Sequence, residues 1–457
     1  MFSPFEYKGL WFIPDKEEDA LTGQLHFDGS DRPTLDVVGS FYPPEELFSR
    51  KLKDLSVIWG HTTDGRKVTL FECNVSNFQI NNQAVVPTFT YRCSMAVVGG
   101  HFKVPNEIKC REIFVEFTLL EDWLGQDCFH PSHKEGNEGV VEIKKPNLIE
   151  FNISDKIVGR FETTWSMNSS KEGRQKLLLH QTSSLALIAD EEKTIDEFRE
   201  VIYHFQRFMA FATGENVYAR EIKFGDLETI QANAGKRMSV VYPIEVFTAP
   251  PAGKVDLLMP FSYRKIAGVF EEVIANWFAC REHLEPVFNL YFDVHYNRFR
   301  FNENSFLNTI QAIETFHRRT GKNNVLDKEE HKKRIEGILK TVNAEDAKWL
   351  KEKLMFSNEP SLHQRLEDLI DSYHTQLLAK IIGDKQGFIQ RVKWSRNYYT
   401  HYDSSNEKKA LTDSELFYEN EKLKILLKTC LLREIGFDED TIGEVMKRDG
   451  SVRWIAS

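Results

Sequence analysis

The residue pattern changes near residue 262, and this change constrains the fold more than any other feature of the sequence. Over about the first 185 residues, short alternating runs such as Gln24–Phe27, Lys67–Phe71 and Ile113–Phe117 are typical of strands. Beyond residue 262, apolar residues recur at helical spacing. We therefore expect a multidomain α+β protein, in which a β-rich, sandwich-like or barrel-like N-terminal part precedes an all-α helical bundle.

The chain has 457 residues, too many for one compact core. We expect a β-rich domain over 1–260, a helical connector over 261–300 and a helical domain over 301–457. Thr194 and Glu197 predict a capping box, which starts a helix inserted in the β-rich part at about 194–213. The segment from Asn77 to Phe117 fits consecutive antiparallel strands. Further strands and a boundary loop are predicted at Ser239–Tyr242, Glu245–Phe247 and Ala249–Gly253.

The helical part contains several amphipathic stretches. They are Ile266–Cys280, Phe306–Arg319, Asp327–Thr341, Ala344–Phe356, Ser361–Ile382, Gln386–Tyr402 and Ser414–Ile435. The last is predicted to begin with a capping box of Thr412 and Glu415 and to end before Gly436.

The net charge of −10 gives no support for a protein that coats nucleic acid non-specifically, so any RNA contact must be local. The six cysteines are isolated and lack zinc spacing, which suggests a reducing cytoplasm and no metal site. The sequence has no secretory signal and no apolar stretch of about 20 residues that would span a bilayer. We expect a cytoplasmic protein that needs no cofactor and has no membrane partner.

The segment from Trp394 to Asp403 carries the most chemical information. Arg396 offers a planar fork for a phosphate, and His401 can carry a proton near neutral pH. RNA supplies its own nucleophile, the 2′-OH, so cleavage without a metal needs proton transfer and charge stabilisation at phosphorus. Arg396 and His401 meet much of that need, and Asn397 can orient the histidine or hold a phosphate oxygen.

Arg396 and His401 are five residues apart, which is about 140° around an ideal helix. A single regular helix would not aim both side chains at one atom. Either the helix loosens near Thr400, or the site forms where two such helices face each other. The second arrangement predicts a homodimer through the helical domain.

The spacing alone is weak evidence, because the same spacing recurs between Arg199 and His204. That pair lacks the amide that follows Arg396. Its neighbours Phe198 and Phe205 belong to an apolar face, so we interpret the pair as structural.

The segment Arg396-Asn-Tyr-Tyr-Thr-His401 resembles the R-N-x3-H signature of HEPN domains. The helix Ser305–His317, followed by further helices and then this segment, is similar to the ApeA-like HEPN family. The first 260 residues or so also resemble the β-rich N-terminal domain of those proteins, including Glu6-Tyr-Lys-Gly-Leu-Trp-Phe-Ile-Pro14. Leu258-Met-Pro-Phe-Ser and Asn276-Trp-Phe fit the region between the two domains. The resemblance thus covers nearly the whole chain.

This resemblance implies a metal-independent endoribonuclease, usually dimeric, that acts in bacterial antiphage defence by abortive infection. Arg396 and His401 would be catalytic, supported by Asn397. RNA would be the substrate, and a phage-derived activator would bind the β-rich domain, which has a sensing or regulatory role.

Other residues near the motif are weaker candidates. Tyr398, Tyr399 and Tyr402 can stack on bases, although such residues more often pack helices. Glu314 can contact the Arg396 site, but a surface or helix-pairing role is more common. The basic run His331–Arg334 is more typical of a solvated helix face than of an RNA contact. Cys128, His130 and His133 have no second ligand pair nearby, which disfavours a metal site.

Two other functions remain open from the sequence. The helical domain can be a non-catalytic dimeric scaffold whose β-rich partner domain binds a phage or host ligand. Alternatively, the β-rich part can process or bind carbohydrate, although no spacing selects a catalytic pair among Glu72, Asp122 and Glu142.

Overall fold

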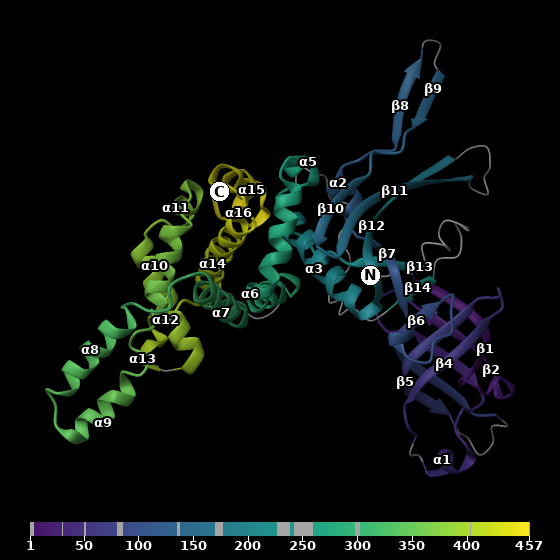
Figure 1. Ribbon diagram of the computed structural model, residues 1–457, viewed down its shortest axis with the longest axis horizontal. Helices are drawn as coiled ribbons and strands as arrows, with labels where there is room; N and C mark the ends of the chain where they lie inside the picture. The colour runs from purple at the N-terminus through teal and green to yellow at the C-terminus, as the bar shows by residue number, and fades with distance from the viewer. Residues whose placement is uncertain are drawn as a thin grey trace. The chain divides into compact units, whose positions relative to one another are not determined.

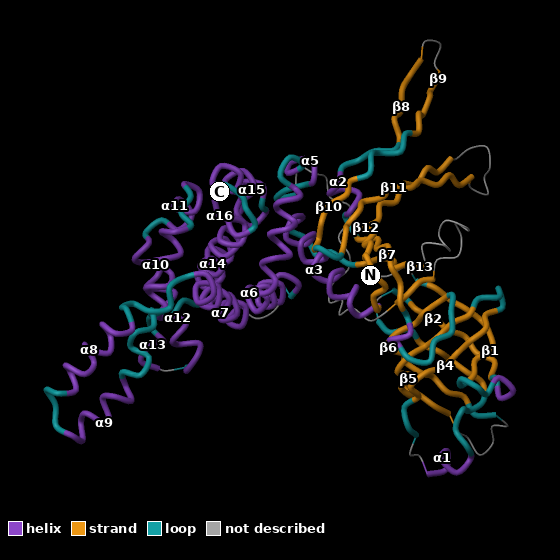
Figure 2. Tube along the Cα trace, viewed as in Figure 1, coloured by secondary structure: helices purple, strands orange, loops and turns teal. Residues whose placement is uncertain are grey.

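The computed structural model describes residues 4–29, 31–49, 52–79, 86–134, 138–169, 177–225, 238–241, 259–297, 302–402 and 404–456. The chain forms two compact units, Met1–Glu271 and Glu272–Ser457. All the described strands lie in the first unit, and the second is helical (Figures 1 and 2). The predicted α+β class, with strands preceding a helical bundle, is confirmed. The expected strand Glu245–Phe247 and loop Ala249–Gly253 lie outside the described residues.

Six antiparallel strands of the first unit close into a barrel. They are β1 (Phe5–Phe12), β2 (Leu21–Phe27), β3 (Thr34–Val38), β4 (Leu55–Thr62), β5 (Lys67–Gln79) and β6 (Thr88–Val98). Their order is β6-β3-β2-β1-β4-β5, and β5 pairs back with β6. The structure thus selects the barrel from the sandwich-like and barrel-like alternatives.

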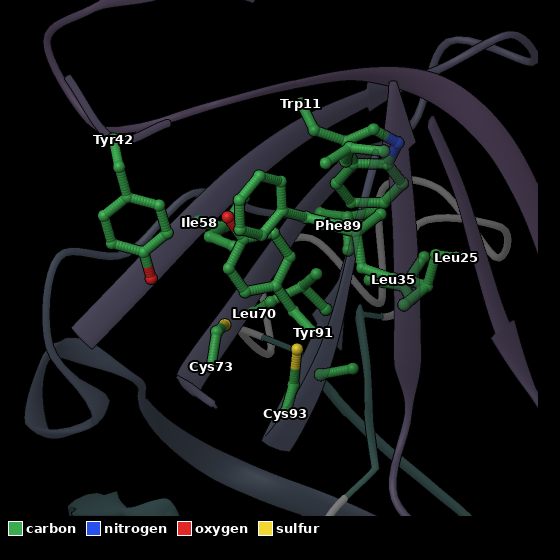
Figure 3. Close-up of a cluster of buried hydrophobic side chains, with 14 residues drawn as sticks. Trp11, Leu25, Leu35, Tyr42, Ile58, Leu70, Cys73, Phe89, Tyr91 and Cys93 are labelled. Carbon is green, nitrogen blue, oxygen red and sulfur yellow. The ribbon is translucent and has the colours of Figure 1, made fainter. Parts of the chain in front are cut away.

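The barrel encloses a core of aromatic and aliphatic side chains (Figure 3). Trp11, Leu35 and Tyr91 are fully buried there, as expected for the inward residues of alternating strands. A Cβ atom added to Gly60 would lie 2.4 Å from the Trp11 ring. A glycine at this position therefore makes room for the largest side chain of the core.

The sheet continues beyond the barrel from β6. The order is β10-β11-β12-β7-β13-β14-β6, formed by β7 (Lys109–Phe117), β10 (Ile149–Ser154), β11 (Ile157–Ser169), β12 (Leu177–Thr194), β13 (Ala219–Gly225) and β14 (Met238–Val241). A separate hairpin, β8 (Phe129–Lys134) and β9 (Glu138–Ile143), projects from this part of the unit (Figure 1). The prediction of consecutive antiparallel strands over Asn77–Phe117 is confirmed by the end of β5, by β6 and by β7. Strands β13 and β14 lie between β6 and β7 in the sheet, and the local pattern contains no signal for this long-range pairing.

The helix expected at about 194–213 is α3 (Ile195–Thr213). Its capping box forms as predicted: the Glu197 carboxylate accepts a hydrogen bond from the Thr194 backbone N–H at 2.9 Å, and the Thr194 hydroxyl accepts one from Glu197 N–H. The Phe205 ring lies 5.5 Å from the Phe117 ring of β7, so α3 packs on the sheet. The short elements of this unit are η1 (Glu17–Asp19), α1 (Pro44–Ser49), η2 (Pro105–Glu107), α2 (Leu120–Leu124) and α5 (Tyr263–Ile266).

The second unit is built around α14, a helix that is buried along most of its length. The helices are α6 (Phe270–Tyr296, which begins in the first unit), α7 (Asn302–Thr320), α8 (Lys328–Leu339), α9 (Ala344–Lys353), α10 (Leu362–Ser372), α11 (Gln376–Ile382), α12 (Lys385–His401), α13 (Ser404–Glu407), α14 (Asp413–Glu434), α15 (Glu439–Arg448) and α16 (Gly450–Ala456). α7 packs against α14, α12 and α10. Of the apolar face predicted from the sequence, Ile310, Ile313 and Phe316 are buried and Leu307 is partly buried, while Phe306 is also buried.

Two predictions for this unit are wrong. The stretch Ser361–Ile382 is two helices rather than one, because the Thr375 side chain caps a new helix by accepting a hydrogen bond from Leu378 N–H at 3.1 Å. The capping box of Thr412 and Glu415 does not form. Within the described residues the Thr412 side chain makes no capping hydrogen bond, and Glu415 N–H instead donates to the Thr412 carbonyl at 3.0 Å.

Candidate functional site

The predicted catalytic residues lie on the last turns of α12. Asp384 caps the start of this helix, and its carboxylate accepts a hydrogen bond from Gly387 N–H at 3.1 Å. Phe388, Ile389 and Val392 are buried and anchor its first half. The helix ends at His401, and Tyr402 follows with a left-handed backbone (φ 49°).

The helix stays regular through the motif. The backbone N–H of Tyr402 donates to the Tyr398 carbonyl, and the Thr400 hydroxyl donates to the Arg396 carbonyl at 2.7 Å. The alternative in which the helix loosens near Thr400 is therefore wrong. On a regular helix Arg396 and His401 point about 140° apart, so one copy of α12 does not aim both at one atom.

Arg396 is a half-buried cation that lies close to an acidic side chain. Its Nη2 lies 3.7 Å from Oε2 of Glu314 on α7, and the two side chains are 34% and 30% exposed. Its Nη1 lies 3.5 Å from the Asn397 side-chain oxygen. The structure thus brings Arg396, Asn397 and Glu314 together. A guanidinium has five N–H donors, so these two long contacts leave capacity for a phosphate.

His401 and Tyr402 are exposed at the end of α12, and 67% of Tyr402 is accessible. Tyr399 differs. Its ring is buried and lies 6.3 Å from Phe306, and its hydroxyl donates to the Leu411 carbonyl at 2.7 Å. Burial raises the pKa of Tyr399. Tyr399 therefore has a packing position, while the Tyr402 ring is open to a ligand.

The segment after α13 is held on α12 by a residue that sequence reasoning missed. Ser395 is fully buried, and its hydroxyl accepts a hydrogen bond from Leu411 N–H at 2.9 Å while donating to the Arg391 carbonyl at 2.9 Å. Tyr399 binds the carbonyl of the same Leu411. We call the two hydrogen bonds that Ser395 and Tyr399 make with the Leu411 backbone the Leu411 clamp. A lone serine in a helix carries no signal for such a role.

A buried polar group on α7 and α10 was also missed. His317 is 3% exposed and Arg365 is 2% exposed. Arg365 Nη1 donates to Nδ1 of His317 at 3.0 Å, so Nε2 carries the imidazole proton and faces Asp368 Oδ2 at 3.2 Å. Burial lowers the pKa of His317. His317 lies one turn after Glu314 on α7, which places this group beside the Arg396 contact.

The positions of Arg199 and His204 fit the structural role expected from the sequence. Arg199 is exposed and lies 3.3 Å from Asp196, whereas His204 is buried on the packed side of α3. The two side chains therefore lie on different faces of α3, one exposed and one buried.

The remaining sequence candidates belong to elements other than α12. Lys332, Lys333 and Arg334 are exposed on α8, which fits a solvated face. His130 and His133 are three residues apart on β8, hence on opposite faces of the strand. Glu72, Asp122 and Glu142 belong to three separate elements.

The part of the chain that the structure describes contains no group of three or more His, Cys, Asp or Glu side chains arranged to hold a metal ion. It also contains no helix of the length and apolarity needed to cross a membrane.

Comparison with known families gives two matches. Residues 6–277 match the family model described as ApeA N-terminal domain 1, and residues 307–441 match the one described as Apea-like HEPN. HEPN domains are usually associated with nucleases and typically dimerise. No curated protein and no solved structure matches the chain. The second match includes α12 with Arg396, Asn397 and His401.

Proposed function

Because this chain belongs to the family in which ApeA N-terminal domain 1 precedes an Apea-like HEPN domain, we propose that it is a metal-independent endoribonuclease of bacterial antiphage defence, acting by abortive infection. The observation that carries the proposal is the end of α12. There a half-buried Arg396 and an exposed His401 stand on one rigid helix.

In the proposed reaction the 2′-oxygen of RNA attacks the adjacent phosphorus, and the bond from phosphorus to the 5′-oxygen breaks. One general base takes the proton from the 2′-OH, and one general acid gives a proton to the leaving 5′-oxygen. His401 serves as general acid or base. Arg396 binds the phosphate and stabilises its added negative charge. The products are a 2′,3′-cyclic phosphate, or a 3′-phosphate after hydrolysis, and a 5′-OH.

Asn397 and Glu314 support Arg396 in this proposal. The Glu314 carboxylate limits where the long arginine side chain can lie, and Asn397 contacts the same guanidinium. A fixed arginine loses less conformational entropy when it binds a phosphate.

The angle between Arg396 and His401 supports a two-chain site. Since one helix directs them about 140° apart, each phosphate would contact side chains from two copies of α12. We therefore propose a homodimer through the helical domain. To test for this homodimer, RNA cleavage is measured after Arg396→Ala protein is mixed with His401→Ala protein. Regained cleavage in the mixture supports a shared site, whereas two variants that remain inactive together contradict it.

The proposed activity is tested by RNA cleavage in EDTA, with end analysis of the products. Arg396→Ala and His401→Ala should each lower the rate by about 100-fold or more, as expected for loss of proton transfer or charge stabilisation. Arg199→Ala is the matched control, because it removes an exposed arginine with the same spacing to a histidine. A folded His401→Ala variant with undiminished cleavage would sink the assignment.

We also propose that the β-rich domain holds the regulatory role and receives a phage-derived activator, because a cell must restrain a nuclease that can cut its own RNA. Cleavage measured with and without extract of infected cells tests this.

If protection against phage persists in the Arg396→Ala and His401→Ala variants, the non-catalytic scaffold is the correct function instead.

A further inference from the structure

The face of α12 that carries His401 also carries a tryptophan. Trp394 precedes His401 by seven residues, so the two side chains point within about 20° of each other, about 10.5 Å apart along the axis. Both belong to the same regular helix. Trp394 is half-buried, so part of its ring is accessible.

A lysine from the segment after α13 lies over this ring. Lys409 Nζ is 5.6 Å from the centre of the Trp394 ring, within the range of a cation–π contact. The Leu411 clamp explains why the lysine is there: Ser395 and Tyr399 bind both backbone groups of a residue only two positions later. The clamp thus sets Lys409 beside Trp394.

This edge of the helical unit carries exposed positive charge. Lys408 and Lys409 are both exposed, and His401 lies on the same face of α12 as Trp394, whereas Arg396 points about 160° away from Trp394. The whole chain has a net charge of −10, so these two adjacent exposed lysines differ from its average charge. A ligand with both a flat ring and a negative group would satisfy the tryptophan and the lysines together.

We propose that Trp394, Lys408 and Lys409 form a nucleotide subsite for single-stranded RNA, next to the position of cleavage. The inference rests on the proposed nuclease function. An unpaired base stacks on the Trp394 ring, while the flexible lysines move onto the phosphates that flank it. A base inside a duplex cannot reach the ring, because its faces are covered by its neighbours. The subsite therefore selects unpaired RNA and fixes the register of the strand relative to His401.

The first test measures kcat and KM for cleavage of a single-stranded RNA by the full chain. Stacking on an aromatic side chain is worth about 1–3 kcal/mol per base, so Trp394→Ala should raise KM by about 5- to 150-fold and leave kcat within about twofold. Trp394→Phe should retain most of the affinity, since it keeps a ring. Trp349→Ala is the matched control, because that tryptophan is exposed on α9.

The second test scans one abasic nucleotide along the RNA. With the wild type, loss of one particular base near the cleavage position should weaken binding by about the factor seen for Trp394→Ala. With Trp394→Ala, that same abasic substitution should have no further effect. A merely structural tryptophan would not produce this pattern.

Lys409→Glu keeps the inference testable if Trp394→Ala does not fold, because Lys409 is exposed. This variant should weaken binding of a non-cleavable 2′-deoxy-substituted RNA and lower the slope of log affinity against log salt by about one or more. Unchanged affinity and salt slope, or an unchanged KM and abasic profile in folded Trp394→Ala, would overturn the subsite. If the wild type cleaves no RNA at all, the proposed function fails instead.

Discussion

The two hydrogen bonds of the Leu411 clamp should stabilise the segment after α13 against local unfolding from α12. Replacing Ser395 with alanine removes the acceptor of Leu411 N–H, in a place where both residues are buried. A buried donor left without its partner costs about 1–3 kcal/mol. Tyr399→Phe should cost a similar amount, because it leaves the Leu411 carbonyl without its donor.

Amide hydrogen exchange of Leu411 measures this cost directly. At about 1.4 kcal/mol per factor of ten, Ser395→Ala should speed exchange at Leu411 by about 5- to 150-fold. The double variant with Tyr399→Phe should show less than the sum of the two single costs, because both bonds hold the same residue. Exchange in α14, beyond its first turn, should change little.

Thr400→Ala is the control on the same helix. Among the described residues, the Thr400 hydroxyl binds within its own helix, to the Arg396 carbonyl, and the side chain is exposed. Its loss should change stability by less than about 0.5 kcal/mol and leave Leu411 protected. The reasoning is refuted if Ser395→Ala and Thr400→Ala have equal exchange at Leu411.

Three further predictions concern stability. Lys428→Met leaves the buried Asp449 carboxylate without its cationic partner, although Ser451 still donates hydrogen bonds to it, and should cost about 3–5 kcal/mol in denaturant unfolding of the helical unit. Burial lowers the pKa of His317 from its ordinary 6.5, so as the pH falls the histidine is protonated in the unfolded chain before it is protonated in the folded one. The free energy of unfolding should therefore fall as the pH drops below about 6.5. His317→Gln should remove that part of the pH dependence. Thr194→Ala should cost about 0.5–2 kcal/mol in the β-rich unit, measured by its thermal transition, and a cost near zero would contradict the capping role.

The local sequence pattern predicted where helices lie, but it missed the break between α10 and α11 and the missing capping bond at Thr412. The Thr194 capping box forms, whereas the similar pattern at Thr412 does not. The difference lies outside the local sequence. Thr412 directly follows Leu411, whose two backbone groups are already bonded to α12. Tertiary hydrogen bonds therefore fix the chain where the pattern alone would place a cap.

The site could be predicted only where the motif is continuous in sequence. Arg396 and His401 stand in one segment, and Glu314 was a candidate because its helix belongs to the same resemblance. The contacts that support them join residues far apart in the chain: Ser395 binds Leu411, and Arg365 binds His317. A single sequence offers no signal for such pairs, since each residue alone is an ordinary helical residue.

The carboxylate beside Arg396 bears on the proposed homodimer as well as on the proposed RNA binding. Arg396 already has Glu314 at 3.7 Å, so an arriving phosphate places a second negative group beside the same cation. One copy therefore offers a phosphate little net positive charge at Arg396. A second copy of α12 would bring another arginine and histidine to the same phosphate and offset the carboxylate. The charge at Arg396 and the separation of about 140° between Arg396 and His401 on a regular helix thus both support the proposed homodimer.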